Sequence, residues 1–197
     1  MRCSDGRCLR LITGARIEAK GYTATTVAVV ATSARVSAET VYATFGGKRG
    51  LLEAVIEAAV LDEEANRDKP DWAADIERLE SSRERLRAWV AHTCGHLQHT
   101  SPIHALIRGT ADSDSFAADL RRRLLAERLA AQTERARQFL AGRLRPGLSV
   151  EEAGERYCAL LSPELFHVLT TEMGWSPDRH RTWITGLLGV ELLPPGG

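Results

Sequence analysis

Apolar side chains recur three and four positions apart along most of this chain, the spacing that places them on one face of an α-helix. In the first third these positions are Leu9, Ile12, Thr13, Ile17, Val27, Val30, Ala31, Val41, Phe45, Leu51, Leu52, Val55 and Ala59. No run alternates apolar and polar residues as a half-buried strand does. The pattern therefore predicts an all-α fold.

Polar caps divide the rest of the chain into further helices. Ser81-x-x-Glu84 and Ser149-x-x-Glu152 have the spacing of capping boxes, while Ser162-Pro163 and Ser176-Pro177 each place a proline behind a capping serine. We expect one helix to begin near residue 81. Three further helices are expected over 150–161, 163–173 and 177–193. A helix from 48 to about 64 is expected before a loop at 66–71. Pro102 is expected to end the helix that begins near residue 81 and to start a short helix that ends at Gly109.

Two of these helices carry longer stripes. In the helix that begins near residue 81 the stripe is Leu86, Trp89, Val90, Thr93 and Leu97. A long helix over 115–144 is expected to bury Phe116, Leu120, Leu124, Leu125, Leu129, Ala136 and Leu140.

Two short helices near the N-terminus are joined by a tight turn. Thr25 is a candidate N-cap for the first, Ala34 and Arg35 form the break, and Ser37 is a candidate N-cap for the second. Val41 and Phe45 are expected to face the core. The outward face is small and rich in hydroxyls, and consists of Ala38, Glu39, Thr40, Tyr42 and Thr44. This layout is typical of a helix-turn-helix at about 25–44, whose second helix enters the DNA major groove.

Residues 6–60 resemble the DNA-binding domain of the tetracycline-repressor (TetR) family of regulators. The resemblance rests on Gly21-Tyr22, on Thr25-Thr26, and on Val36-Ser37-x-x-Thr40-Val41-Tyr42-x-x-Phe45-x-x-Lys48-x-x-Leu51-Leu52. It implies a homodimer that binds a near-palindromic double-stranded operator, with a larger helical domain at 61–197 for ligand binding and dimerisation. Ser162-Pro163-Glu164-Leu165 and Gly174-Trp175-Ser176-Pro177 resemble an actinobacterial-type subgroup.

The resemblance also implies roles for single residues. Thr25, Thr26, Tyr42, Thr44 and Lys48 match positions that contact phosphates, and Ala38, Glu39 and Thr40 match positions that face bases. Arg35 stands where the family usually has glycine; a positive φ there costs roughly 1 kcal/mol, and its charge can add a phosphate contact. Two interpretations of Glu39 stay open, because its carboxylate can accept a hydrogen bond from cytosine N4 or stabilise the start of its helix.

Charge is divided unevenly along this 197-residue chain, whose net charge is zero. Residues 1–60 hold eight basic and five acidic residues, a net charge of +3, and residues 61–197 carry −3. A basic N-terminal domain favours approach to a polyanion. No apolar run reaches the roughly 18 residues of a membrane span. The four cysteines lack metal-site spacing and no export signal precedes them, so we expect a cytoplasmic protein with reduced thiols.

The C-terminal helices supply the remaining candidate sites. The dimer interface is predicted at Tyr157, Leu161, Leu165, Trp183 and Leu187, and a ligand pocket at Trp89, His96, His99, Arg108 and Phe116. His92, His96 and His99 share one helix face, which leaves a zinc or nickel site as an alternative to a polar surface. Without a nucleophile elbow, a phosphate loop or a His-Glu-x-x-His motif, no enzyme and no cofactor are predicted.

The function predicted from these patterns is a homodimeric transcriptional repressor that a small-molecule effector releases from its operator. A helical small-molecule or metal-binding protein with a vestigial DNA-binding domain is the alternative. The effector, the operator sequence and the choice between repression and activation stay open.

Overall fold

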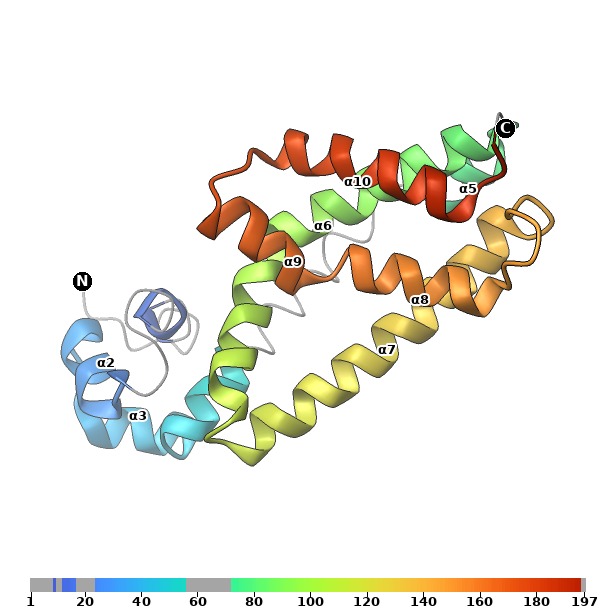
Figure 1. The fold of residues 1–197 in the computed structure, drawn as a ribbon. Coiled ribbons are helices and arrows are strands. Elements are labelled where there is room, and N and C mark those ends of the chain that lie inside the picture. The colour runs from blue at the N-terminus through green and yellow to red at the C-terminus, as the bar shows by residue number, and fades with distance from the viewer. Residues whose placement is uncertain (1–8, 10–11, 17–23, 56–71, 196–197) are drawn as a thin grey trace. The chain divides into compact units, whose positions relative to one another are not determined.

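The computed structural model describes residue 9 and residues 12–16, 24–55 and 72–195. The expected helix end near residue 64, the loop at 66–71 and the boundary between residues 60 and 61 lie outside these residues, as do Ile17, Gly21 and Tyr22. The described residues are helical or form turns between helices, which confirms the all-α fold (Figure 1). In this part of the chain no helix is long and apolar enough to cross a membrane.

The chain divides into two units, one formed by Met1–Asp68 with Leu106–Ala118 and the other by the remaining residues. In the first unit, α2 spans Val27–Ala34 and α3 spans Ala38–Phe45, and residues 48–55 are helical. The predicted stripes meet in one core, whose members are Leu9, Val27, Val30, Ala31, Ala34, Val41 and Leu51. This core holds α2 against α3.

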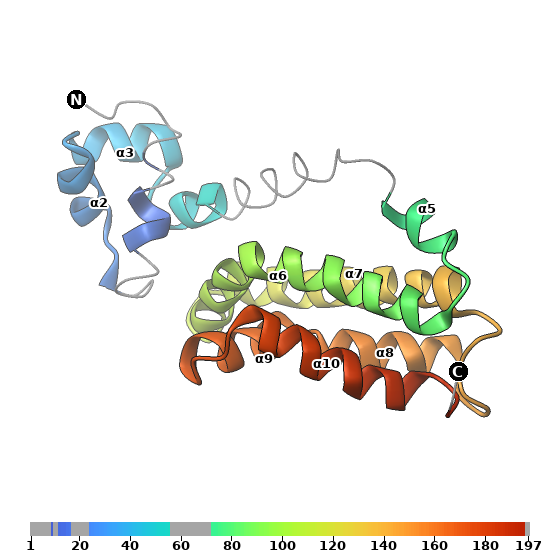
Figure 2. The ribbon, with the colours of Figure 1, turned by 90° about the horizontal axis from the view of Figure 1, so that it is seen from above.

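The second unit contains the remaining helices, apart from one end of two of them. These helices are α5 (Trp72–Glu77), α6 (Ser82–Ala111), α7 (Ser115–Leu140), α8 (Val150–Leu160), α9 (Pro163–His167), the π-helix η1 (Val168–Glu172) and α10 (Pro177–Leu192). Residues 106–111 of α6 and 115–118 of α7 belong to the first unit. Figures 1 and 2 show α10 beside α6 and α8 beside α7. The centre is aromatic, since the Trp89 and Tyr157 rings stack with centroids 3.6 Å apart and Phe139 meets Trp89 edge-on.

The predicted caps are confirmed at most helix starts. The side chains of Ser37, Ser149, Ser162 and Ser176 each accept a hydrogen bond from a backbone N–H three residues further on. Ser149 and Glu152 form the complete capping box. The N-cap of α2 is Thr26, not Thr25, because Thr25 is buried and it is the Thr26 hydroxyl that accepts from the Val29 N–H.

Three expectations about the long helices were wrong. Pro102 does not end a helix, because α6 continues through it to Ala111. A proline removes one hydrogen bond and its ring crowds the carbonyl four residues earlier, but the long helical segments on both sides outweigh this cost. The helix α7 ends at Leu140, four residues before the expected end. Leu125 is 52% exposed and therefore not a core residue.

Candidate nucleic-acid interface

The turn between α2 and α3 is built by one left-handed residue. Arg35 has φ 59° and ψ 40°, and its N–H donates to the carbonyls of Ala31 and Thr32 at the end of α2. Arg35 therefore has the positive φ whose cost was considered from the sequence. The guanidinium is attached to an exposed residue at the turn, where a cation can contact a phosphate.

The start of α3 is closed by hydroxyl groups. Ser37 accepts from the Thr40 N–H at 3.2 Å, and its oxygen lies 3.1 Å from Thr40 Oγ1. The Ser37 hydroxyl and the backbone N–H of Glu39 lower the pKa of the Glu39 carboxyl below its usual value. Glu39 is exposed and ionised at neutral pH, so the carboxylate is stabilised at the helix N-terminus.

Tyr42 is the most prominent side chain on the outward face of α3. Its exposed fraction is 56%, whereas Val41 next to it is fully buried. The ring lies over Gly47, where an added Cβ would come 3.4 Å from Tyr42 Cε1. Gly47 has φ 129°, a conformation that suits glycine, so the backbone after α3 can pass close beneath the ring.

The other predicted contact residues differ in what they offer DNA. Thr26 is exposed, and because its oxygen accepts from Val29 its O–H can still donate. The Thr44 hydroxyl donates to the Thr40 carbonyl at 2.8 Å, which occupies its donor. Thr25 is buried, Ala38, Thr40 and Lys48 are half-buried, and Ser37 is exposed. The burial of Thr25 corrects its assignment to a direct side-chain phosphate contact.

Two features of this region were not predicted. Gly50 allows a close backbone approach, since an added Cβ would lie 2.8 Å from the carbonyl carbon of Phe45. The Arg49 guanidinium lies 5.3 Å from the ring centroid of Phe116 and donates to Glu53 at 3.1 Å. The Gly46-Gly47 pair was the available sequence signal for a close backbone approach near Gly50. The contact between Arg49 and Phe116 has no local signal, because 67 positions separate these two residues.

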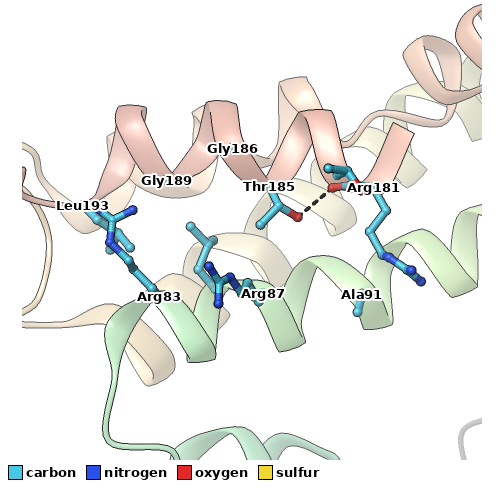
Figure 3. A pocket seen from close by; sticks show the side chains of 10 residues that line it. Arg83, Arg87, Ala91, Arg181, Thr185, Gly186, Gly189 and Leu193 are labelled. Carbon is cyan, nitrogen blue, oxygen red and sulfur yellow. Dashed lines mark hydrogen bonds between the residues drawn. The ribbon is translucent and has the colours of Figure 1, made fainter. Parts of the chain in front are cut away.

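The residues predicted to line a ligand pocket differ in burial. Trp89 is fully buried in the aromatic core, and His99 is exposed while His96 is half-buried. Arg108 and Phe116 belong to the first unit. None of the five lines the groove of about 480 Å³ that α6 and α10 form in the second unit (Figure 3).

One of the histidines of α6 packs against an aromatic ring. Trp72 stacks on the His92 ring with centroids 3.7 Å apart, and desolvation together with the nearby Arg135 lowers the pKa of His92 to about 4. Among the described residues, no three His, Cys, Asp or Glu side chains are placed to hold a metal ion.

The predicted dimer residues fall into two groups. Tyr157 and Leu161 are buried inside the chain, where the Tyr157 hydroxyl lies 2.8 Å from Thr93 Oγ1, and this corrects their assignment to a dimer surface. Trp183 is 41% exposed, and Leu165 and Leu187 are half-buried. Val190 of α10, 72% exposed, was not predicted.

An exposed short helix that bears hydroxyls, packed on a second helix through a tight turn, is the helix-turn-helix of DNA-binding proteins. Residues 15–55 match the family described as bacterial regulatory proteins, tetR family. The matched segment contains α2 and α3, so this part of the chain is similar to the DNA-binding domain of that family of transcription regulators. No curated protein matches the sequence.

Solved structures of similar fold cover almost the whole chain. A transcriptional regulator from Saccharomonospora viridis, in complex with choline, is 19% identical with a TM-score of 0.72, and the match covers 95% of this chain and 97% of that one. The ketosteroid transcriptional regulator KstR2 of Mycobacterium tuberculosis is 18% identical with a TM-score of 0.62, covering 94% and 93%. SmeT, the repressor of a Stenotrophomonas maltophilia multidrug efflux pump, is 15% identical with a TM-score of 0.63, covering 95% and 90%. The chain therefore has the fold of these regulators.

Proposed function

We propose that this protein is a homodimeric, ligand-responsive repressor that binds a near-palindromic operator through α3. The observation that carries the proposal is the outward face of α3, where the exposed Tyr42 stands over Gly47. Arg35 lies before this helix and Lys48 after it. A small hydroxyl-bearing face between two cations suits a helix that must approach base edges while its ends meet phosphates.

A dimer gives this short helix its affinity. One eight-residue helix makes few contacts, and half-sites on one face of B-DNA recur about every 34–36 Å. The α3 helices of the two protomers, the reading helices, can bind two half-sites at once when they have that spacing. A ligand that favours a dimer with another spacing weakens DNA binding by the free-energy difference between the two dimer arrangements. We place the protein in the cytoplasm with its DNA.

A small-molecule effector is supported by similar regulators. The Saccharomonospora viridis regulator was crystallised with choline, and SmeT with triclosan. These ligands differ in charge and polarity, so the shared fold does not specify the chemistry of the effector. The effector of this chain is therefore proposed only as a small molecule that binds the second unit.

The test begins with selection of bound DNA from a random pool, followed by affinity measurements on the selected site. Tyr42→Phe removes only the hydroxyl, and we expect a loss of about 1 kcal/mol, roughly fivefold, if it donates to a phosphate. Lys48→Ala is expected to weaken all sequences alike and to reduce the salt slope by about 1. Arg121→Ala, an exposed position of α7, is the control and should change neither quantity.

The alternative function has its own outcome in this experiment. Absence of DNA binding at low salt by a protein shown to be dimeric would contradict the repressor and favour a helical small-molecule-binding protein. A salt slope that is the same for the wild type and Lys48→Ala would contradict the phosphate contact alone.

A further inference from the structure

The groove between α6 and α10 is lined by three arginines and no carboxylate. Arg83 and Arg87 lie one helical turn apart on α6, and Arg181 faces them from α10 (Figure 3). Like charges at this spacing on one helix repel each other, and a third cation across the groove adds to the repulsion. An anion bound between them would remove this unfavourable charge.

Arg87 and Arg181 keep accessible positive charge in the groove. Arg181 forms one ion pair, with Asp178 at 3.0 Å, and both side chains are about half exposed or more, so an incoming anion can compete for the guanidinium. Arg87 is exposed and makes no ion pair among the residues that the structure describes. Guanidinium groups bind carboxylates and phosphates through two parallel hydrogen bonds.

The remaining walls are apolar or small. Leu86, Ala91 and Leu193 supply carbon surface, and α10 presents no side chains to the groove at Gly186 and Gly189. The Arg83 guanidinium lies beside α10 at Gly189, where an added Cβ would be 3.6 Å from Arg83 Nη1, an ordinary contact distance. At Gly186 an added Cβ would meet nothing within 4 Å, so this part of the groove is open.

The groove is separate from the exposed apolar face of α10. At 100° per residue, the lining residues Arg181, Thr182, Thr185 and Gly189 point about 150° away from the centre of Trp183, Leu187 and Val190. A partner on the apolar face therefore leaves the arginines accessible. The volume of about 480 Å³ lies in the range of small-molecule sites.

We propose that this groove binds an amphipathic oxyanion, a carboxylate or phosphate joined to an apolar group, with its charged end on Arg83, Arg87 and Arg181. Thr182 and Thr185 line the same wall, and the Thr185 hydroxyl donates to the Arg181 carbonyl at 2.7 Å, which leaves its lone pairs rather than its proton toward the groove. The charged end is therefore held by the guanidinium groups. This site does not depend on DNA binding.

The test is titration calorimetry of the full chain, without DNA, against octanoate, octyl phosphate, 1-octanol and inorganic phosphate. We expect at least one of the two amphipathic anions to bind once per chain, and the tighter of them identifies the charged group. Octanol and inorganic phosphate should each bind at least tenfold more weakly. Equal affinity for octanol, or for inorganic phosphate, would overturn the proposal that charge and apolar surface are recognised together.

Variants locate the site. Arg87→Gln and Arg83→Gln should each lower the affinity for the anion roughly tenfold or more, because each removes a charge-assisted hydrogen bond. Gly186→Leu should abolish binding by filling the open part of the groove, and it favours the helix, so its melting temperature should not fall. Arg121→Gln removes the same charge from α7 and should have no effect. Unchanged binding in Arg87→Gln and in Gly186→Leu would overturn the assignment.

Discussion

Arg35 ends α2 in a left-handed conformation that a side chain with a Cβ adopts only at a cost of roughly 1–2 kcal/mol. It is the single non-glycine residue with positive φ among the described residues. The family usually has glycine here, which adopts this conformation without strain. Arginine at this position adds strain to the backbone but places a positive charge beside α3. Stability and DNA affinity should therefore respond in opposite directions when Arg35 is replaced by glycine.

Arg35→Gly is expected to raise the free energy of unfolding by roughly 0.5–1 kcal/mol, because the relief of strain exceeds the added entropy of the unfolded chain. Arg35→Ala keeps the strain and should not stabilise. Both variants lose the charge, so both should weaken DNA binding equally. Urea denaturation and affinity on the selected operator measure the two effects. Equal stability of the two variants would show that the relief of strain does not exceed the added entropy of the unfolded chain.

Glu39 is expected to act through the helix start. Its pKa is lowered by Ser37 and by its own backbone N–H, so the carboxylate stabilises α3 at neutral pH, and this contribution is lost as the pH falls below the usual value of 4.5. Glu39→Ala should tighten DNA binding without changing base preference, since it removes repulsion from phosphates. Selection of DNA with Glu39→Ala and Glu39→Gln tests this; relaxed preference at one base pair in both would instead assign Glu39 to cytosine.

At the level of helices, starts were predictable from sequence and ends were not. The serine caps at residues 37, 149, 162 and 176 are local, because each hydroxyl bonds a backbone N–H three residues away. The continuation of α6 through Pro102 depends on helical segments on both sides, and the end of α7 depends on its neighbours. Arg85 shows why: its guanidinium donates to the Leu79 carbonyl at 2.6 Å and to the Phe139 carbonyl at 3.3 Å, 54 positions away.

The contact of α8 with α7 requires a glycine. A Cβ at Gly154 would lie 2.6 Å from Thr133 Cα, so Gly154→Ala forces the two helices apart and should cost about 1–3 kcal/mol. Gly95 in α6 is the matched control, because an added Cβ there meets nothing within 4 Å and alanine should gain roughly 0.5–1 kcal/mol. Thermal unfolding of both variants tests the packing; stabilisation by Gly154→Ala would contradict this close approach.

For the whole molecule, the exposed face of α3 is easier to predict from the sequence than the groove between α6 and α10. The motif around Tyr42 is short and continuous, so its spacing alone places the exposed residues. The arginine groove joins Arg87 to Arg181, 94 positions apart, and no local pattern pairs them. Trp89 and Tyr157 illustrate the same limit, because an apolar stripe shows that a residue is buried but not whether a partner subunit or the chain's own core covers it.

Dimerisation is the prediction that connects the second unit to DNA binding. Trp183, Leu187 and Val190 share one side of α10, and Val190 and Trp183 are 72% and 41% exposed in the single chain. An exposed apolar stripe of this kind marks an interface, and a buried carboxylate within it would be strongly unfavourable. Val190→Asp is therefore expected to yield monomers that still fold.

The matched control is Leu125→Asp, which places the same charge at a 52% exposed apolar position of α7. Sedimentation equilibrium should show a dimer for the wild type and Leu125→Asp, and a monomer for Val190→Asp with an unchanged helical spectrum. Operator affinity should fall at least a hundredfold in Val190→Asp alone, because a monomer presents one reading helix to a site built from two half-sites. If Leu125→Asp dissociated the dimer and Val190→Asp did not, the interface would have to be assigned to α7 instead of α10.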